Sequence, residues 1–76
     1  MSKTLDRLSN GEQGRIISIN GGRGVRSRLE AMGVREGKEL QKVSAQMFRG
    51  PVTIMIDGGQ IALGHGIARK IIIEIT

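Results

Sequence analysis

Apolar and polar residues alternate with a period of two along several short stretches of the chain, a pattern typical of β-strands with one buried face. The clearest stretch is 52–57, where Val52, Ile54 and Ile56 share one face and the residues between them share the other. With the weaker stretches included, the pattern predicts five strands, at 14–19, 38–44, 52–57, 60–63 and 71–75.

Turn-forming residues and irregular spacing refine this prediction. The sequence Asp57-Gly58-Gly59 supplies the positive φ angles that a tight hairpin turn requires, so we predict that the strands on either side of it pair antiparallel. In 14–19 and 38–44 the apolar positions fall out of phase, as Leu40 and Val43 do. A β-bulge in each strand would restore the pattern.

A different period appears between the first two predicted strands. Val25, Leu29 and Met32 recur at i, i+4 and i+7, which gives one apolar face to a helix of about ten residues. Gly33 follows at the position where helices commonly end in a left-handed residue. We therefore predict one short helix, at 25–32, between strands.

The composition fits a small, mostly β domain. The chain has 76 residues, which is enough for a single domain, 1–76, with one core. Its apolar residues include eleven isoleucines and four valines against one aromatic residue, Phe48, and β-branched side chains favour strands. Short strands, tight turns and one helix together predict a partly open barrel of the SH3-like or OB-like kind.

Several blocks of residues occur in a specific order and spacing. They are Leu5-x-x-Leu8-x-x-Gly11-Glu12-x-Gly14-Arg15-Ile16, then Arg28-Leu29-x-x-Met32-Gly33-Val34-x-x-Gly37, then Gly50-Pro51-Val52, Ile61-Ala62-Leu63 and Ala68-x-x-Ile71. Taken together, they resemble the ferrous iron transport protein A (FeoA) family over nearly the full chain. The resemblance implies an SH3-like barrel that acts in the bacterial cytoplasm with FeoB, a membrane ferrous iron transporter that carries a GTPase domain.

The chain departs from the family pattern at two places. Met32 stands where the family usually has leucine, a substitution that conserves volume. The residues Gly64-His65-Gly66-Ile67 stand where the family tends to carry charged, helix-compatible residues, and two glycines weaken a helical turn before Ala68. The same kind of barrel is the C-terminal domain of iron-dependent repressors, but no helix-turn-helix precedes it in this sequence.

The residue types exclude several kinds of chemistry. The chain has no cysteine and one histidine, His65, so it cannot build a cysteine zinc site or a two-histidine-one-carboxylate iron site by itself. We interpret His65 as an exposed loop residue. The glycine-rich stretch 20–24 lacks the Gly-Lys-Ser/Thr ending of a P-loop, and no catalytic motif is recognisable. We expect no enzyme activity, cofactor, metal or small-molecule substrate.

Arginines gather on and around the predicted helix, and their guanidinium groups suit carboxylates or phosphates on a partner. The alternative is a solvated helix face in which Arg26 pairs with Glu30 at i+4. Met47 and Phe48 form either an exposed apolar anchor or a lid on one end of the barrel. The candidate partner-binding residues are Arg23, Arg26, Arg28, Leu29, Met32 and Arg35.

The formal charge of +5 has two interpretations: it favours binding to an acidic partner, or it is the ordinary charge of a soluble protein surface. The lack of cysteine and of an N-terminal apolar leader favours the cytoplasm. Three functions fit: an accessory protein that binds and modulates FeoB and reaches the membrane only through it, a nucleic-acid-binding barrel, or a detached regulatory domain of a metal-dependent repressor. We do not favour nucleic acid, since Phe48 is the only aromatic side chain for stacking. Exposed sheet edges would also allow the chain to associate with itself as a homo-oligomer.

Overall fold

The structure, a computed structural model, describes residues 1–45 and 50–76. The predicted loop residues Met47 and Phe48 lie outside this range. The elements, in chain order, are β1 (Ser2–Thr4), the 3-10 helix η1 (Leu5–Arg7), β2 (Gln13–Ile19), α1 (Arg23–Ala31), β3 (Glu39–Ala45), β4 (Val52–Ile56), β5 (Gly59–Leu63), α2 (His65–Ala68) and β6 (Ile71–Ile75).

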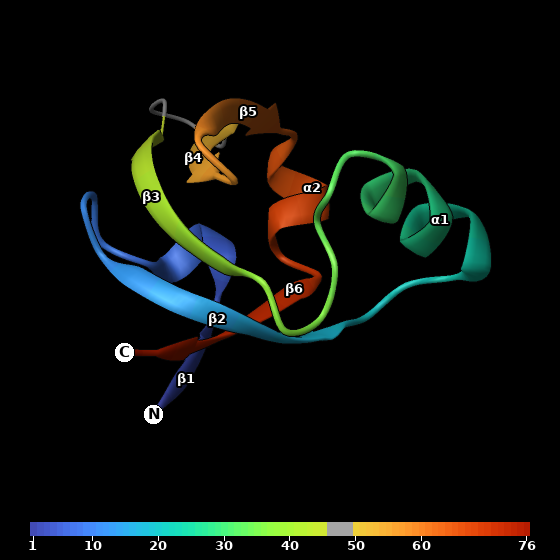
Figure 1. Cartoon of the computed structure of the whole chain (residues 1–76), viewed down its shortest axis with the longest axis horizontal. Helices are drawn as coiled ribbons and strands as arrows, with labels where there is room; N and C mark the ends of the chain where they lie inside the picture. The colour runs from blue at the N-terminus through green and yellow to red at the C-terminus, as the bar shows by residue number, and fades with distance from the viewer. Residues whose placement is uncertain (46–49) are drawn as a thin grey trace.

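The six strands of the described residues form one antiparallel sheet in the order β1-β6-β2-β3-β4-β5. The sheet is curved, and α1 stands at one end of the molecule while the two chain ends lie close together at the other (Figure 1). The amino group of Met1 is 3.2 Å from Oε2 of Glu74, which joins β1 to β6 at that end. None of the described helices is long and apolar enough to cross a membrane.

Two β-bulges explain the irregular spacing of the apolar residues. The register of β2 against β6 shifts between Ile16 and Ser18, and that of β3 against β4 shifts between Lys42 and Ser44. The shift in β2 brings Ile19, three positions after Ile16, back to the buried face, and Ile17 between them is 43% exposed. The bulges predicted in these two strands are confirmed.

The hairpin between β4 and β5 is also confirmed. Asp57 has φ 52° and Gly58 has φ 78°, and Ile56 pairs with Gly59 directly across the turn. Two consecutive residues with positive φ match the right-handed twist of the paired strands, which is why the Asp-Gly pair forms this turn.

The structure differs from the prediction in two elements. The three-residue strand β1 makes a sixth strand by pairing with β6, and it is too short to show a period of two. In addition, the segment before Ala68 forms the single turn α2 despite its two glycines. The carbonyl of Gly64 accepts hydrogen bonds from the N–H groups of Ile67 at 3.0 Å and Ala68 at 2.9 Å. Full burial of Ala68 offsets the low helix propensity of the glycines.

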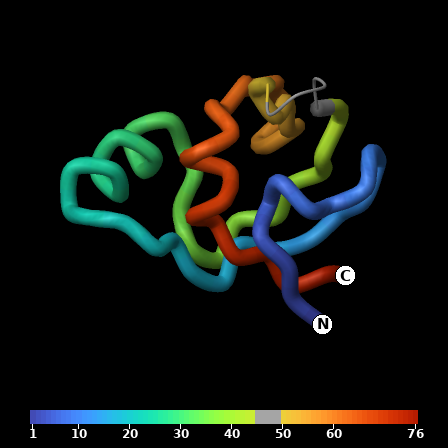
Figure 2. Tube along the Cα trace, turned by 180° about the vertical axis from the view of Figure 1, so that it is seen from behind, coloured from blue at the N-terminus to red at the C-terminus, as the bar shows by residue number. Residues whose placement is uncertain are grey.

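An aliphatic core fills the inside of the sheet. Ile16, Ile54, Ile71 and Ile73 are almost completely buried. At Gly14, β2 lies so close to β6 that a Cβ atom would contact the Ile73 side chain and lie 2.7 Å from the Glu74 carbonyl oxygen. The predicted aliphatic sheet core is confirmed, and Figure 2 shows from behind how α1 projects from it.

Candidate functional site

Helix α1 ends in a Schellman motif. The Gly33 N–H donates to the Glu30 carbonyl at 3.0 Å, and the Val34 N–H donates to the Leu29 carbonyl at 2.9 Å. Gly33 has φ 87°, as predicted for the residue that follows the helix. Leu29 and Val34 are both buried, so this end of α1 is packed onto the core.

Two of the six candidate partner-binding residues, Arg26 and Arg35, donate side-chain hydrogen bonds within the chain. Arg26 donates from Nη1 to the Ile19 carbonyl at 2.7 Å and from Nη2 to Oε2 of Glu36 at 3.3 Å. The alternative pairing of Arg26 with Glu30 is therefore wrong, because α1 lies beside the end of β2 and the turn after the helix, and Arg26 reaches across to both. Arg35 donates to the Glu30 carbonyl at 3.3 Å.

The other four candidate residues differ in exposure. Arg23 and Arg28 are exposed, and neither makes a side-chain hydrogen bond or ion pair with a residue in the described part of the chain. Met32 is 42% exposed, whereas Leu29 is a core residue with 2% exposure. A partner can therefore contact only a small part of the Leu29 side chain, at the bottom of a depression.

A hollow of 190 Å³, here called the α1 groove, brings three of these candidates together with residues from another part of the fold. One wall comes from α1 and Met32, and the other comes from the end of β5, Gly64 and α2. Its lining is mostly apolar, with the Arg28 side chain as the charged member. The lining residues are Val25, Arg28, Leu29, Met32, Ala62, Leu63, Gly64 and Ile67.

The second wall of the α1 groove was not predicted as part of the site. Ala62, Leu63, Gly64 and Ile67 lie more than thirty positions from most of α1 in the sequence, and only the fold places them opposite the helix. The block Ile61-Ala62-Leu63, which helped to identify the family, was the available signal, but it carried no indication that it faces α1.

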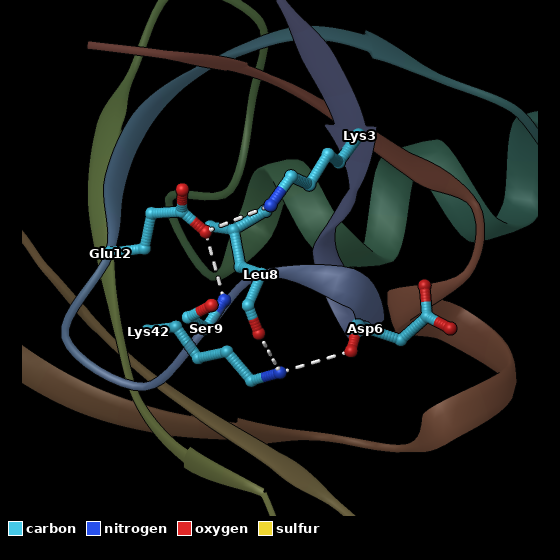
Figure 3. Close-up of polar contacts among 6 residues, drawn as sticks. All are labelled: Lys3, Asp6, Leu8, Ser9, Glu12 and Lys42. Carbon is cyan, nitrogen blue, oxygen red and sulfur yellow. Dashed lines mark hydrogen bonds and ion pairs between the residues drawn. The ribbon is translucent and has the colours of Figure 1, made fainter.

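A second polar arrangement ties the N-terminal segment to the sheet (Figure 3). Lys42 on β3 is 3% exposed, and its Nζ donates to the Leu8 carbonyl at 2.6 Å and the Asp6 carbonyl at 3.0 Å. Burial lowers the pKa of Lys42, and the nearby carboxylates of Asp6 and Glu12 oppose this shift. The arrangement is structural, because the ammonium group is enclosed and donates to two backbone carbonyls of the N-terminal segment.

Glu12 is the acidic member of the same arrangement. Its Oε1 accepts the Ser9 N–H at 2.9 Å and lies 3.4 Å from Nζ of Lys3. The Ser9 N–H, which hydrogen-bonds the charged form, lowers the pKa of Glu12, and Lys3 adds to the shift. The acidic side chain thereby fastens the turn between η1 and β2.

His65 lies on α2 and not in an exposed loop, which corrects the interpretation made from the sequence. Its side chain is 26% exposed, and Nε2 is 3.9 Å from Oδ2 of Asp6. Helix formation at 65–68 turns the imidazole toward η1. Within residues 1–45 and 50–76, no group of three or more His, Asp or Glu side chains could hold a metal ion.

A curved six-stranded antiparallel sheet with a helix between β2 and β3 defines the class of small SH3-like barrels, and solved structures agree. A crystal structure of an iron uptake regulatory protein, FeoA, superimposes with a TM-score of 0.93 at 28% identity and covers 100% of both chains. A manganese-dependent transcriptional repressor superimposes with a TM-score of 0.91 at 19% identity, over 99% of this chain and 37% of that one. The second likeness shows a shared fold.

Sequence comparison gives the family. The FeoA domain profile matches residues 3–75. A putative Fe(2+) transport protein A of Methanocaldococcus jannaschii is 39% identical over 64 residues, which are 84% of this chain and 76% of that protein. The chain belongs to the FeoA family, whose members act in ferrous iron transport as accessory proteins.

Proposed function

We propose that this chain binds the cytoplasmic side of a FeoB-type ferrous iron transporter and modulates its activity, and that the α1 groove is the contact. The observation that carries the proposal is the combination of an apolar hollow with an arginine, Arg28, that makes no side-chain hydrogen bond or ion pair within the described part of the chain. Family membership supports the choice of partner.

The chemistry of the α1 groove suits a partner segment with an apolar side chain next to a carboxylate. The apolar side chain enters the hollow and is removed from water, which contributes about 1.5–3 kcal/mol when its burial is complete. Met32 at the rim adapts its shape to the incoming group, because a thioether side chain is unbranched and flexible. The Arg28 guanidinium forms a charge-assisted hydrogen bond with the carboxylate.

Modulation follows from binding only if the transporter has two states and the chain prefers one. A ligand shifts an equilibrium by its difference in affinity for the two states and by nothing else. We infer that α1 and β5 contact a transporter surface whose shape changes between these states. Arg26, which ties α1 to the end of β2 and to the turn after the helix, keeps the groove in one geometry during this contact.

Binding of the purified chain to the detergent-purified FeoB-type transporter of the same cell tests the proposal. Arg28→Glu reverses the charge at the groove, Met32→Lys makes its rim polar, and Ala62→Arg fills it from the opposite wall. Each change should weaken binding about tenfold or more, as truncation of central interface residues does. GTP hydrolysis by the transporter, measured in parallel, reports modulation.

Arg15→Glu is the matched control, because Arg15 is exposed on β2, outside the groove, and the charge change is the same as at Arg28. Binding should persist in this variant. Wild-type affinity in all three groove variants, or equal weakening in the control, would refute the groove as the contact. Absence of wild-type binding would refute the partner.

A further inference from the structure

A second hollow, here called the η1–α2 hollow, lies on a different part of the surface and takes no part in the proposed contact. It has a volume of 440 Å³ and is lined by Thr4, Asp6, Arg7, His65 and Arg69. These residues come from the end of β1, from η1, and from α2 with the residue that follows it. Every lining side chain carries a polar or charged group.

The charges in the η1–α2 hollow are unbalanced. Arg7 and Arg69 are exposed, and neither makes a side-chain hydrogen bond or ion pair with a residue in the described ranges. The single carboxylate, Asp6, is already engaged. Its Oδ1 accepts the Thr4 hydroxyl at 2.5 Å, and its Oδ2 faces Nε2 of His65 at 3.9 Å.

Hydrogen bonds fix the backbone on two sides of the η1–α2 hollow. Lys42 donates to the Asp6 carbonyl at 3.0 Å, and Figure 3 shows the Asp6 carboxylate pointing away from Lys42. On the other side, the Arg69 N–H donates to the His65 carbonyl at 3.0 Å, which closes the turn of α2. Both arginines therefore extend from fixed backbone positions, and less order has to be imposed when a ligand binds.

We propose that the η1–α2 hollow binds the phosphate group of a small molecule. A guanidinium group presents parallel N–H donors that match phosphate oxygens, and arginine is the side chain best suited to such bidentate contacts. A phosphate dianion can use both arginine forks and the imidazole, whereas one carboxylate occupies a single fork. The Asp6 carboxylate opposes the anion and so keeps its affinity modest.

Titration of the full chain with inorganic phosphate at constant ionic strength, followed by amide NMR shifts, tests the proposal. Saturable shifts are expected at 4–7 and 65–69. The double variant Arg7→Gln, Arg69→Gln should weaken binding by about tenfold or more, because it removes two sets of charge-assisted hydrogen bonds. Asp6→Asn should tighten binding severalfold, because it removes the opposing charge and keeps the shape of the side chain.

The double variant Arg15→Gln, Lys38→Gln removes the same two charges outside the hollow and should bind phosphate like the wild type. Equal weakening in this control or non-saturable shifts would overturn the proposal, because each indicates general charge attraction. Unchanged binding in Asp6→Asn would also overturn it, because the anion would then not lie beside Asp6 in the hollow. A nucleoside monophosphate should produce shifts at the same amides. Binding to vesicles containing phosphatidic acid, without a response to inorganic phosphate or the nucleotide, would also overturn it.

Discussion

Replacing Lys42 with methionine should remove a large part of the stability of the fold. The change keeps the length and most of the apolar stem of the side chain, but it deletes the ammonium group that donates to the Asp6 and Leu8 carbonyls. Hydrogen bonds to charged groups contribute about 1.5–3 kcal/mol each, and a buried acceptor left without a donor costs about 1–3 kcal/mol. Burying the ammonium group is unfavourable, and its removal offsets part of this loss.

The net loss should be about 2–4 kcal/mol, because removing one partner of a buried polar contact exposes the cost of the other. A domain of 76 residues has a total unfolding free energy of about 4–11 kcal/mol. Each kcal/mol that is lost should lower the melting temperature by roughly 4–8 °C. Urea unfolding at pH 7 measures the free energy directly, and calorimetry gives the melting temperature.

Lys38→Met is the matched control. Nζ of Lys38 is 2.9 Å from Oδ2 of Asp57, and both side chains are substantially exposed. An exposed ion pair of this kind contributes about 0–1 kcal/mol. If Lys42→Met loses no more than Lys38→Met, the two carbonyls find other donors and the reasoning about Lys42 is wrong.

The remaining predictions concern substitutions at four single positions. The pKa of Glu12 is lowered from 4.5 in the fold. The stabilising effect of its carboxylate is therefore complete above pH 4.5 and is lost as the pH falls through the folded pKa. In Glu12→Gln, a plot of unfolding free energy against pH should fall less steeply on the acid side. Gly14→Ala should cost about 1–3 kcal/mol in urea unfolding by crowding β6, whereas Gly24→Ala, with open space in α1, should gain up to about 1 kcal/mol. Gly58→Ala, at φ 78°, should lower the melting temperature through a cost of about 1–2 kcal/mol.

The strands and turns that were predicted correctly depend on local signals. A hairpin at Asp57 and Gly58 and a helix end at Gly33 each require a positive φ, and aspartate-glycine pairs or single glycines supply it. The two β-bulges could also be inferred, because a phase shift in the apolar pattern is visible within one strand.

The features that could not be predicted depend on residues far apart in the sequence. β1 exists because it pairs with β6 at the other end of the chain. Lys42 alternates like an ordinary strand lysine, and its burial follows from carbonyls at positions 6 and 8. The sequence shows the arginines around α1 as a cluster. It does not show that Arg26 is engaged within the chain, because its partners Ile19 and Glu36 lie beside it only in the folded structure.

The glycines beside His65 connect the two proposed sites. Gly64 has φ −59°, a value that any residue adopts, so its backbone does not require glycine. A Cβ atom at Gly64 or Gly66 would meet nothing within 4 Å. At Gly64 this open space belongs to the α1 groove, while His65 on the next position lines the η1–α2 hollow. Because α2 borders both hollows within one helical turn, changes within α2 would disturb both, and the two proposals are separated by variants of residues that line one hollow alone, such as Arg28 and Ala62 for the groove and Arg7 and Arg69 for the η1–α2 hollow.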